Sequence, residues 1–129
     1  MLTGRVTSDN EAILPIEVLG ADGRAFQVKA GIDTGYNGFL TLPKRMIEDL
    51  DLTFVGPARA ALGDGREVRM DLFLASIQWE GGPRDILVLE SEGGTLVGMG
   101  LLDGCRVVLD VEEGGVVSIE SLAKIRGMN

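Results

Sequence analysis

The feature that most constrains this chain is a series of short apolar stretches separated by glycine-containing turns. Ala12 to Leu19 and Ala25 to Ile32 flank Ala21-Asp22-Gly23-Arg24. Asp-Gly between two such stretches is a strong signal for a β-hairpin. The chain has 19 glycines without a collagen-like period, which is typical of a fold with many tight turns. The sequence therefore predicts a mostly-β protein.

Other parts of the chain have the same character. Further strands are expected at Phe39 to Leu42, Ala58 to Leu62, Arg66 to Leu74 with an extension towards Ile77 and Trp79, Asp85 to Leu89, Val107 to Val111 and Val116 to Ile119. Short helices are expected at Pro43 to Leu50, at Met99 to Asp103 before Gly104, and after a capping Ser121. Strands at short intervals with few helices favour a closed or orthogonally packed β-barrel. The 129 residues are expected to form one domain, 1–129.

Composition excludes several classes of function. The formal net charge of −8 argues against nucleic acid or an anionic membrane as the main partner. The absence of histidine excludes Ser-His and Cys-His nucleophile pairs and the usual zinc ligand sets, so neither a metal nor a cofactor is expected. The single cysteine, Cys105, is expected to be a small buried residue rather than a nucleophile. With no apolar signal segment or membrane-length run, the expected location is the cytoplasm.

One short motif carries candidate chemistry. Asp33-Thr34-Gly35 directly follows the apolar run Val28 to Ile32. A carboxylate at the end of a buried strand is costly unless hydrogen bonds or a function keep it there. The motif is therefore either a turn closed by the Asp33 side chain or a catalytic carboxylate.

The wider sequence resembles the retropepsin-like (clan AA) aspartic proteases, and most closely their bacterial and archaeal branch with an Asp-Thr-Gly-Phe signature. The matching pieces are Ala30 to Gly35, Asn37 to Pro43, the hairpin tip Gly63-Asp64-Gly65, and Leu96-Val97-Gly98 followed by Leu101-Leu102. Their order and spacing agree with the family from about Ile13 to Ile119. The resemblance implies a closed orthogonal β-barrel of the retroviral protease type with one or two short helices.

The resemblance also implies roles for individual residues. Asp33 would be the catalytic carboxylate, Thr34 would bond across a dimer axis, Gly35 would present backbone to substrate, Tyr36 and Asn37 would lie at the substrate site, and Gly63, Asp64 and Gly65 would form the tip of a flap. Leu96-Val97-Gly98 would pack beneath the catalytic loop. For the Tyr36 ring, three interpretations stay open: a pocket wall, a narrowing of the cleft, or packing in the core.

A single Asp-Thr-Gly per chain has a mechanistic consequence. Peptide hydrolysis by carboxylates needs one group to accept a proton from water while another donates to the carbonyl oxygen. Asp64 lies on a hairpin tip and Asp103 ends a helical turn, so both are in poor positions for the second role. The second carboxylate is therefore expected to be Asp33 of another copy, placed face to face by a twofold axis.

The chain departs from retroviral members at one pair of positions. Where those members have an arginine and an aspartate that pair, this chain has Met99 and Asn37. Because both charges are absent together, neither is left buried alone.

The sequence leaves two hypotheses about function. The first is a homodimeric aspartic endopeptidase that acts on a peptide or protein substrate with an activated water. The second is a non-enzymatic peptide-binding or interaction domain that keeps the fold.

Overall fold

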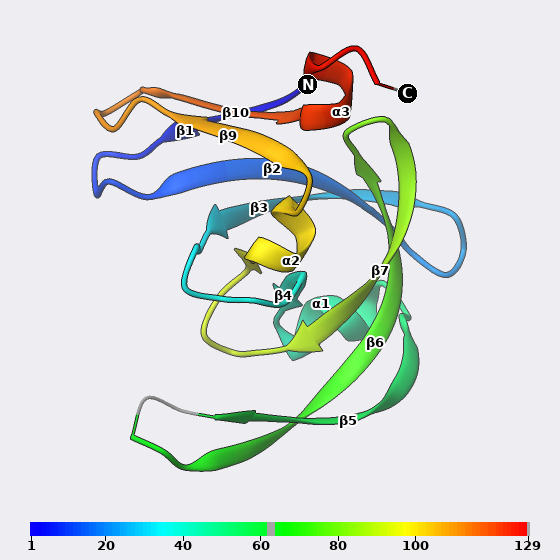
Figure 1. The fold of residues 1–129 in the computed structure, drawn as a ribbon. Coiled ribbons are helices and arrows are strands. Elements are labelled where there is room, and N and C mark those ends of the chain that lie inside the picture. The colour runs from blue at the N-terminus through cyan, green and yellow to red at the C-terminus, as the bar shows by residue number, and fades with distance from the viewer. Residues whose placement is uncertain (62–63, 129) are drawn as a thin grey trace.

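The computed structural model describes residues 1–61 and 64–128, which form ten strands and three short helices (Figure 1). The strands are β1 (Leu2–Val6), β2 (Ala12–Leu19), β3 (Ala25–Ile32), β4 (Leu40–Leu42), β5 (Thr53–Ala61), β6 (Glu67–Trp79), β7 (Gly82–Glu90), β8 (Leu96–Val97), β9 (Cys105–Leu109) and β10 (Val116–Ser121). The helices are α1 (Lys44–Asp49), α2 (Met99–Leu102) and α3 (Leu122–Ile125). The prediction of a mostly-β protein is thus confirmed.

The described strands form one sheet that returns on itself. Its order is β5-β6-β7-β4-β8-β3-β2-β1-β10-β9, and β6 also pairs with β2 through Val18 opposite Ile77 and Leu19 opposite Ser76. The pairings of β6, β7, β4, β8, β3 and β2 therefore run in a cycle. The long strand β6 makes this possible because it pairs with β5 and β7 along its length and with β2 near its end.

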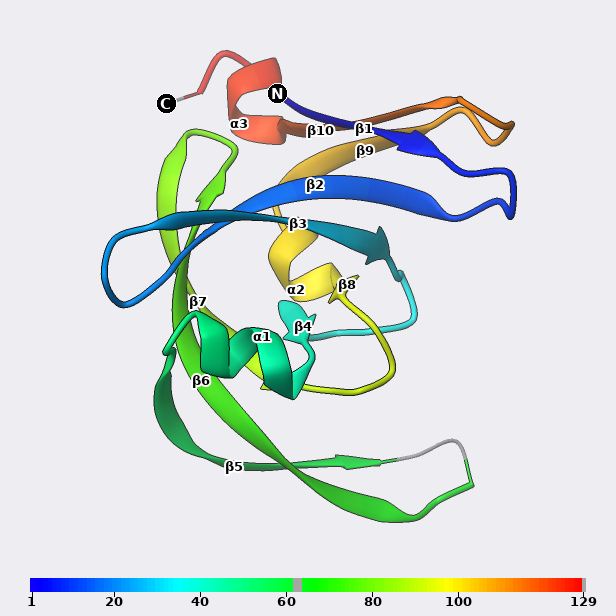
Figure 2. The same ribbon diagram turned by 180° about the vertical axis from the view of Figure 1, so that it is seen from behind.

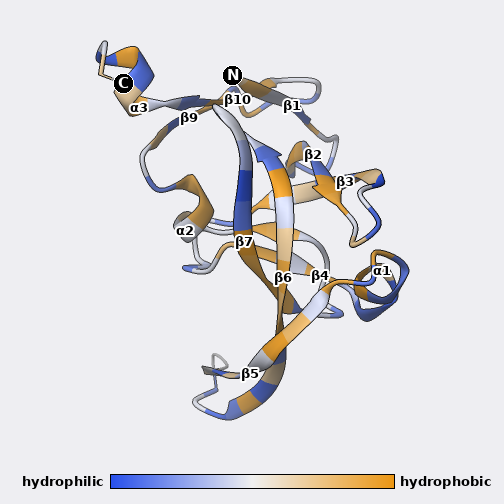
Figure 3. Cartoon of the chain, turned by 90° about the vertical axis from the view of Figure 1, so that its right-hand side faces the viewer, coloured by the Kyte–Doolittle hydropathy of each residue, from blue (hydrophilic) through white to orange (hydrophobic). Residues whose placement is uncertain are grey.

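Alternating burial explains why these segments are strands. In β2, Leu14, Ile16 and Val18 are buried while the residues between them are at least partly exposed, as a period of two requires. Ala75, Ile77 and Trp79 repeat the pattern in β6, where Figure 3 shows bands of hydrophobic and hydrophilic residues. The core also takes Leu40 and Leu42 from β4, and Leu101 and Leu102 from α2.

Helix α1 follows the predicted pattern. It begins after Pro43 and buries Ile47, with Leu50 buried at its end. Seen from behind in Figure 2, it lies in front of β4 and β6. The first residue of the prediction was one position early, since Pro43 is the extended residue that precedes the helix.

Several strand boundaries differ from the prediction. Strand β5 begins at Thr53, five residues earlier than expected, and the predicted end at Leu62 lies outside the described residues. Strand β7 begins at Gly82, three residues earlier than expected, and Pro83 is its second residue, near the strand start where proline is tolerated. The first strand, β1, was not predicted. It lies between β2 and β10, so its partners come from both ends of the chain.

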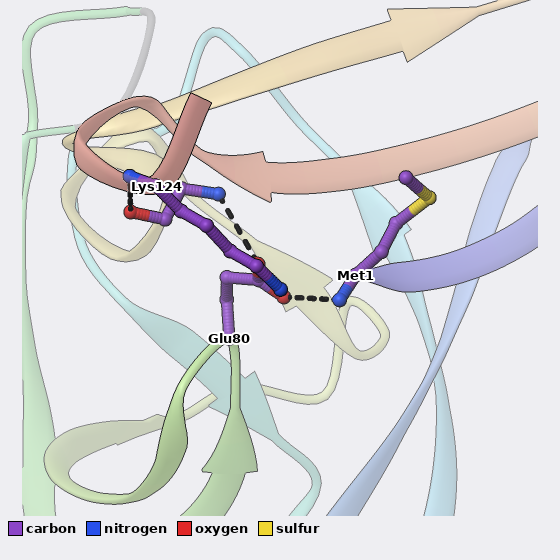
Figure 4. A network of polar contacts seen from close by, with 4 residues as sticks. Met1, Glu80 and Lys124 are labelled. Atoms are coloured by element: carbon purple, nitrogen blue, oxygen red, sulfur yellow. Dashed lines mark hydrogen bonds and ion pairs between the residues drawn. The ribbon is translucent and has the colours of Figure 1, made fainter. Parts of the chain in front are cut away.

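Met1 and the junction of β10 with α3 meet at Glu80, in the turn between β6 and β7 (Figure 4). The α-ammonium of Met1 lies 2.6 Å from Glu80 Oε2, and the N–H of Ser121 donates to Glu80 Oε1 at 3.3 Å. The hydrogen bond from the Met1 ammonium, supported by the one from the Ser121 N–H, holds the pKa of Glu80 below its usual value. Ser121 caps α3 as predicted, accepting from the N–H of Lys124 at 3.3 Å. Among the described helices, none has the length and apolar character needed to span a bilayer.

Candidate active site

The residues from Asp33 to Phe39 form the loop that connects β3 to β4. Strand β8 lies between these two strands, parallel to β3 and antiparallel to β4. Ile32 pairs with Val97, and the N–H of Asp33 then donates to Val97 O at 2.9 Å. The backbone of the candidate catalytic residue is thus fixed by the strand pairing that ends immediately before it.

The Asp33 carboxylate closes a tight turn. Its Oδ1 accepts from the N–H of Gly35 at 2.9 Å, and Asp33 O accepts from the N–H of Tyr36 at 3.2 Å. A side chain at Gly35 would place its Cβ 3.2 Å from Oδ1, so glycine leaves room for the carboxylate. The turn expected from sequence is therefore present. Within residues 1–61 and 64–128, no basic side chain forms an ion pair with Asp33.

The three motif residues differ in exposure. Asp33 is half-buried, while Thr34 and Gly35 are exposed, as is Asn37. A half-buried carboxylate next to exposed backbone can meet a ligand without a large rearrangement.

The loop supplies the hydrogen-bond acceptors for the beginning of α2. The N–H groups of Gly98, Met99 and Gly100 donate to Phe39 O at 2.9 Å, Tyr36 O at 2.7 Å and Gly38 O at 3.0 Å. A helix begins with N–H groups that lack partners inside the helix, and no side chain caps α2. The loop carbonyls therefore replace a side-chain cap, and the loop and helix become one unit.

This close approach requires glycine at two positions in the α2 segment. A Cβ at Gly98 would lie 2.3 Å from Gly38 O, and one at Gly100 would lie 2.8 Å from Asn37 O. Gly98 belonged to the predicted element beneath the catalytic loop, but the importance of Gly100 was missed. Its signal was the Gly-x-Gly spacing of these two residues.

The candidate flap is the β5–β6 hairpin, which ends on the same side of the molecule as the loop from 33 to 39 (Figures 1 and 2). Near its tip, Asp64 Oδ1 accepts from the N–H of Arg66 at 3.0 Å, and Asp64 Oδ2 lies 2.6 Å from Arg66 Nε. Gly65 has a φ of 85°, which favours glycine. Gly63 lies outside the described residues. Among the described atoms, no hydrogen bond joins Asp64 or Gly65 to Asp33.

Cys105 lies outside this site. It is half-buried against the core, and the loss of water around it raises the pKa of its thiol. A raised pKa makes the nucleophilic thiolate scarcer, so the environment does not favour a catalytic cysteine.

The fold is similar to that of a solved aspartic protease. A search of known structures finds the retropepsin-like aspartic protease from Rickettsia conorii, with a TM-score of 0.54 over 92% of this chain and 90% of that chain. Sequence identity is 15%, so the likeness establishes the fold. No protein-family model matches the sequence, and no curated protein matches it.

Proposed function

We propose that this protein is a homodimeric aspartic endopeptidase in which Asp33 from each of two copies forms the catalytic dyad. The observation that carries the proposal is the Asp33 turn, held by Val97 O and Gly35 N–H within a fold similar to a retropepsin-like protease. A water held between the carboxylates would attack the peptide carbonyl. The ionised carboxylate would take a proton from the water, while the protonated carboxyl of the other copy donates its proton to the carbonyl oxygen.

An exposed apolar surface supports the presence of a second copy. Strand β9 is at one end of the described sheet order, and Val108, Leu109, Val111 and Val116 around its hairpin are 37–67% exposed. This hairpin projects on the same side as the loop carrying Asp33 (Figure 1). An unpaired apolar edge favours association with another strand. We propose that a second copy covers it and brings its own Asp33 to a shared axis.

Other parts of the fold support the substrate site. The cycle of six strand pairings supports the proposal of a closed barrel, in which a sheet pairs back onto itself. The β5–β6 hairpin would close over an extended peptide held by backbone hydrogen bonds, as an added strand. Under this proposal Asp64 and Gly65 would lie above the peptide, and Asn37 beside it.

The decisive experiment measures cleavage of an unfolded protein mixture between mildly acidic and neutral pH, with and without pepstatin. Asp33→Asn is the test variant, and Asp103→Asn, which removes an exposed carboxylate after α2, is the matched control. Cleavage should disappear in Asp33→Asn and persist in Asp103→Asn. Activity that survives Asp33→Asn would reject the dyad, and an inactive wild-type protein that binds peptides would favour the interaction-domain hypothesis.

Subunit mixing tests the shared dyad directly. When wild-type and Asp33→Asn chains are mixed equally and exchange freely, about a quarter of the dimers carry two intact carboxylates. A dyad drawn from two copies should therefore leave about a quarter of the activity of the same total concentration of wild-type chains. About half would remain if each chain acted alone, and that result would contradict the dimeric mechanism.

A further inference from the structure

The ring of Tyr36 lies across two glycines that belong to different segments. A Cβ at Gly38 would lie 2.2 Å from Tyr36 Oη and 2.3 Å from Cζ, and a Cβ at Gly98 would lie 2.5 Å from Tyr36 Cδ2. Gly38 belongs to the loop after Asp33, and Gly98 immediately precedes α2. The ring therefore covers the loop with one edge and the beginning of the α2 segment with the other.

The backbone of Tyr36 connects the same two segments. Its N–H donates to Asp33 O at 3.2 Å, and its carbonyl accepts from the N–H of Met99 at 2.7 Å. Tyr36 is thus hydrogen-bonded on one side to the candidate catalytic residue and on the other side to α2. Among the three atoms nearest to a Cβ at either glycine, every side-chain atom belongs to Tyr36.

The contribution of Tyr36 comes from its ring rather than from its hydroxyl. The side chain is half-buried, and this burial raises the pKa of the phenol because the charged form loses water. Among the described residues, no hydrogen-bond partner is found for Oη. The aromatic body therefore supplies the packing.

We infer that Tyr36 is a positioning residue whose ring holds the 33–38 loop against Gly98 and thereby fixes the Asp33 carboxylate. The catalytic part of this inference rests on the proposed function. Two carboxylates that share a proton must meet with little freedom, and a displacement of about 1 Å costs on the order of 100-fold in rate. The ring is suited to this task because it has only two rotatable side-chain bonds and is confined between two backbones.

A double-mutant cycle tests the inference. The three atoms nearest to a Cβ at Gly38 all belong to the Tyr36 side chain, so Gly38→Ala displaces the ring and little else. Tyr36→Ala and Gly38→Ala should each lower kcat by about 10- to 100-fold, while Tyr36→Phe stays within about twofold of wild type. Adding Gly38→Ala to Tyr36→Ala should cause no further loss, because the space is then free. Effects of the two substitutions that simply multiply would overturn the inference.

The kinetic parameters separate positioning from substrate contact. A displaced Asp33 lowers kcat and moves the two apparent pKa values of the pH–rate profile towards each other, because the carboxylates interact less strongly. These measurements are made at a temperature where every variant is folded. A change confined to KM, with the pH profile unchanged, would mean that Tyr36 contacts the substrate and does not position Asp33.

Amide hydrogen exchange tests the same contact without catalysis. The N–H groups of Gly98 and Met99 bond to the loop, so their exchange should become faster in Tyr36→Ala and stay unchanged in Tyr36→Phe. Amides of the β1–β10 pairing serve as the internal control. An inactive wild-type protein with this exchange pattern would reject the peptidase while keeping the structural contact. An active enzyme whose Tyr36→Ala variant has normal kcat and exchange would reject the positioning role alone.

Discussion

The Oγ1 atom of Thr41 lies 2.8 Å from the amide nitrogen of Leu96, whose N–H donates to it. The same hydroxyl donates to Gly94 O at 2.8 Å, and Thr41 is only 4% exposed. A residue of β4 therefore satisfies two backbone groups in the segment that leads into β8. Because β8 carries Val97, which binds the N–H of Asp33, this buried hydroxyl supports the site from one strand away.

Replacing this hydroxyl should destabilise the protein. Thr41→Val leaves Gly94 O and Leu96 N–H without their partner in a partly buried place, which costs about 1–2 kcal/mol of unfolding free energy. Urea denaturation of the variant measures the loss. Thr53→Val, at an exposed position at the start of β5, is the control and should change stability by less than about 0.5 kcal/mol. If both variants lose the same unfolding free energy, the hydrogen bonds of the Thr41 hydroxyl do not stabilise the protein.

Glu80 should make stability depend on pH. Its pKa in the folded protein is below the ordinary value of 4.5, first because the Met1 ammonium binds it. A lowered pKa stabilises the fold above pH 4.5, and this stabilisation is lost as the pH falls through the folded pKa. Glu80→Gln should therefore lower stability by about 0.5–1 kcal/mol near pH 7, and the difference from wild type should shrink as the pH falls below 4.5.

This dependence is measured from the urea denaturation midpoints of wild type and Glu80→Gln between pH 3 and 7. Glu17→Gln is the matched control, because Glu17 is exposed on β2 and takes part in none of the described ion pairs. A constant difference between wild type and Glu80→Gln across the whole range would show that Glu80 acts through packing rather than through its charge.

A methyl group at Gly98 should separate the loop from α2. The Cβ would lie 2.3 Å from Gly38 O, a backbone atom that cannot move without shifting the loop. Gly98→Ala should lower the melting temperature by several degrees, in line with a loss of about 1–3 kcal/mol. Gly56→Ala is the control, since a Cβ there meets nothing within 4 Å. Calorimetry measures the melting temperatures of both variants. Equal decreases would contradict the close contact between Gly98 and Gly38 O.

A charge on the β9 edge should weaken the proposed dimer. Val108 is 43% exposed, so Val108→Lys changes little inside one chain but places an ammonium in an interface between copies. Sedimentation should show at least about a tenfold weaker association, and peptidase activity per chain should fall in parallel at low concentration. The control is Val55→Lys, on strand β5 at the other end of the sheet order. Dissociation caused by the control and not by Val108→Lys would move the interface to β5.

Local signals made much of the fold predictable. The Asp-Gly turn gave the β2–β3 hairpin, and Gly23 has the positive φ of 82° that such a turn needs. The apolar spacing of Met46, Ile47 and Leu50 likewise gave α1. These elements are determined by residues close together in the chain, so a short window of sequence contains the information.

Contacts between distant segments were not predictable in the same way. Strand β1 has few large apolar residues, and its pairing with β10 joins positions more than a hundred residues apart. The fit of Gly98 and Gly100 under the loop after Asp33 depends on the placement of β8 between β3 and β4. The sequence identified Asp33 and its turn, but the ring contact of Tyr36 and the hydroxyl of Thr41 required three-dimensional packing.

Strand β1 has a consequence for biosynthesis. Because it lies between β2 and β10, this strand gains its second partner only when residues 116–119 have been made. Such long-range pairing slows folding. A ribosome stalled before that point would hold a nascent chain with an open sheet edge along β1, and this is the intermediate on which we expect chaperones and proteolytic quality control to act.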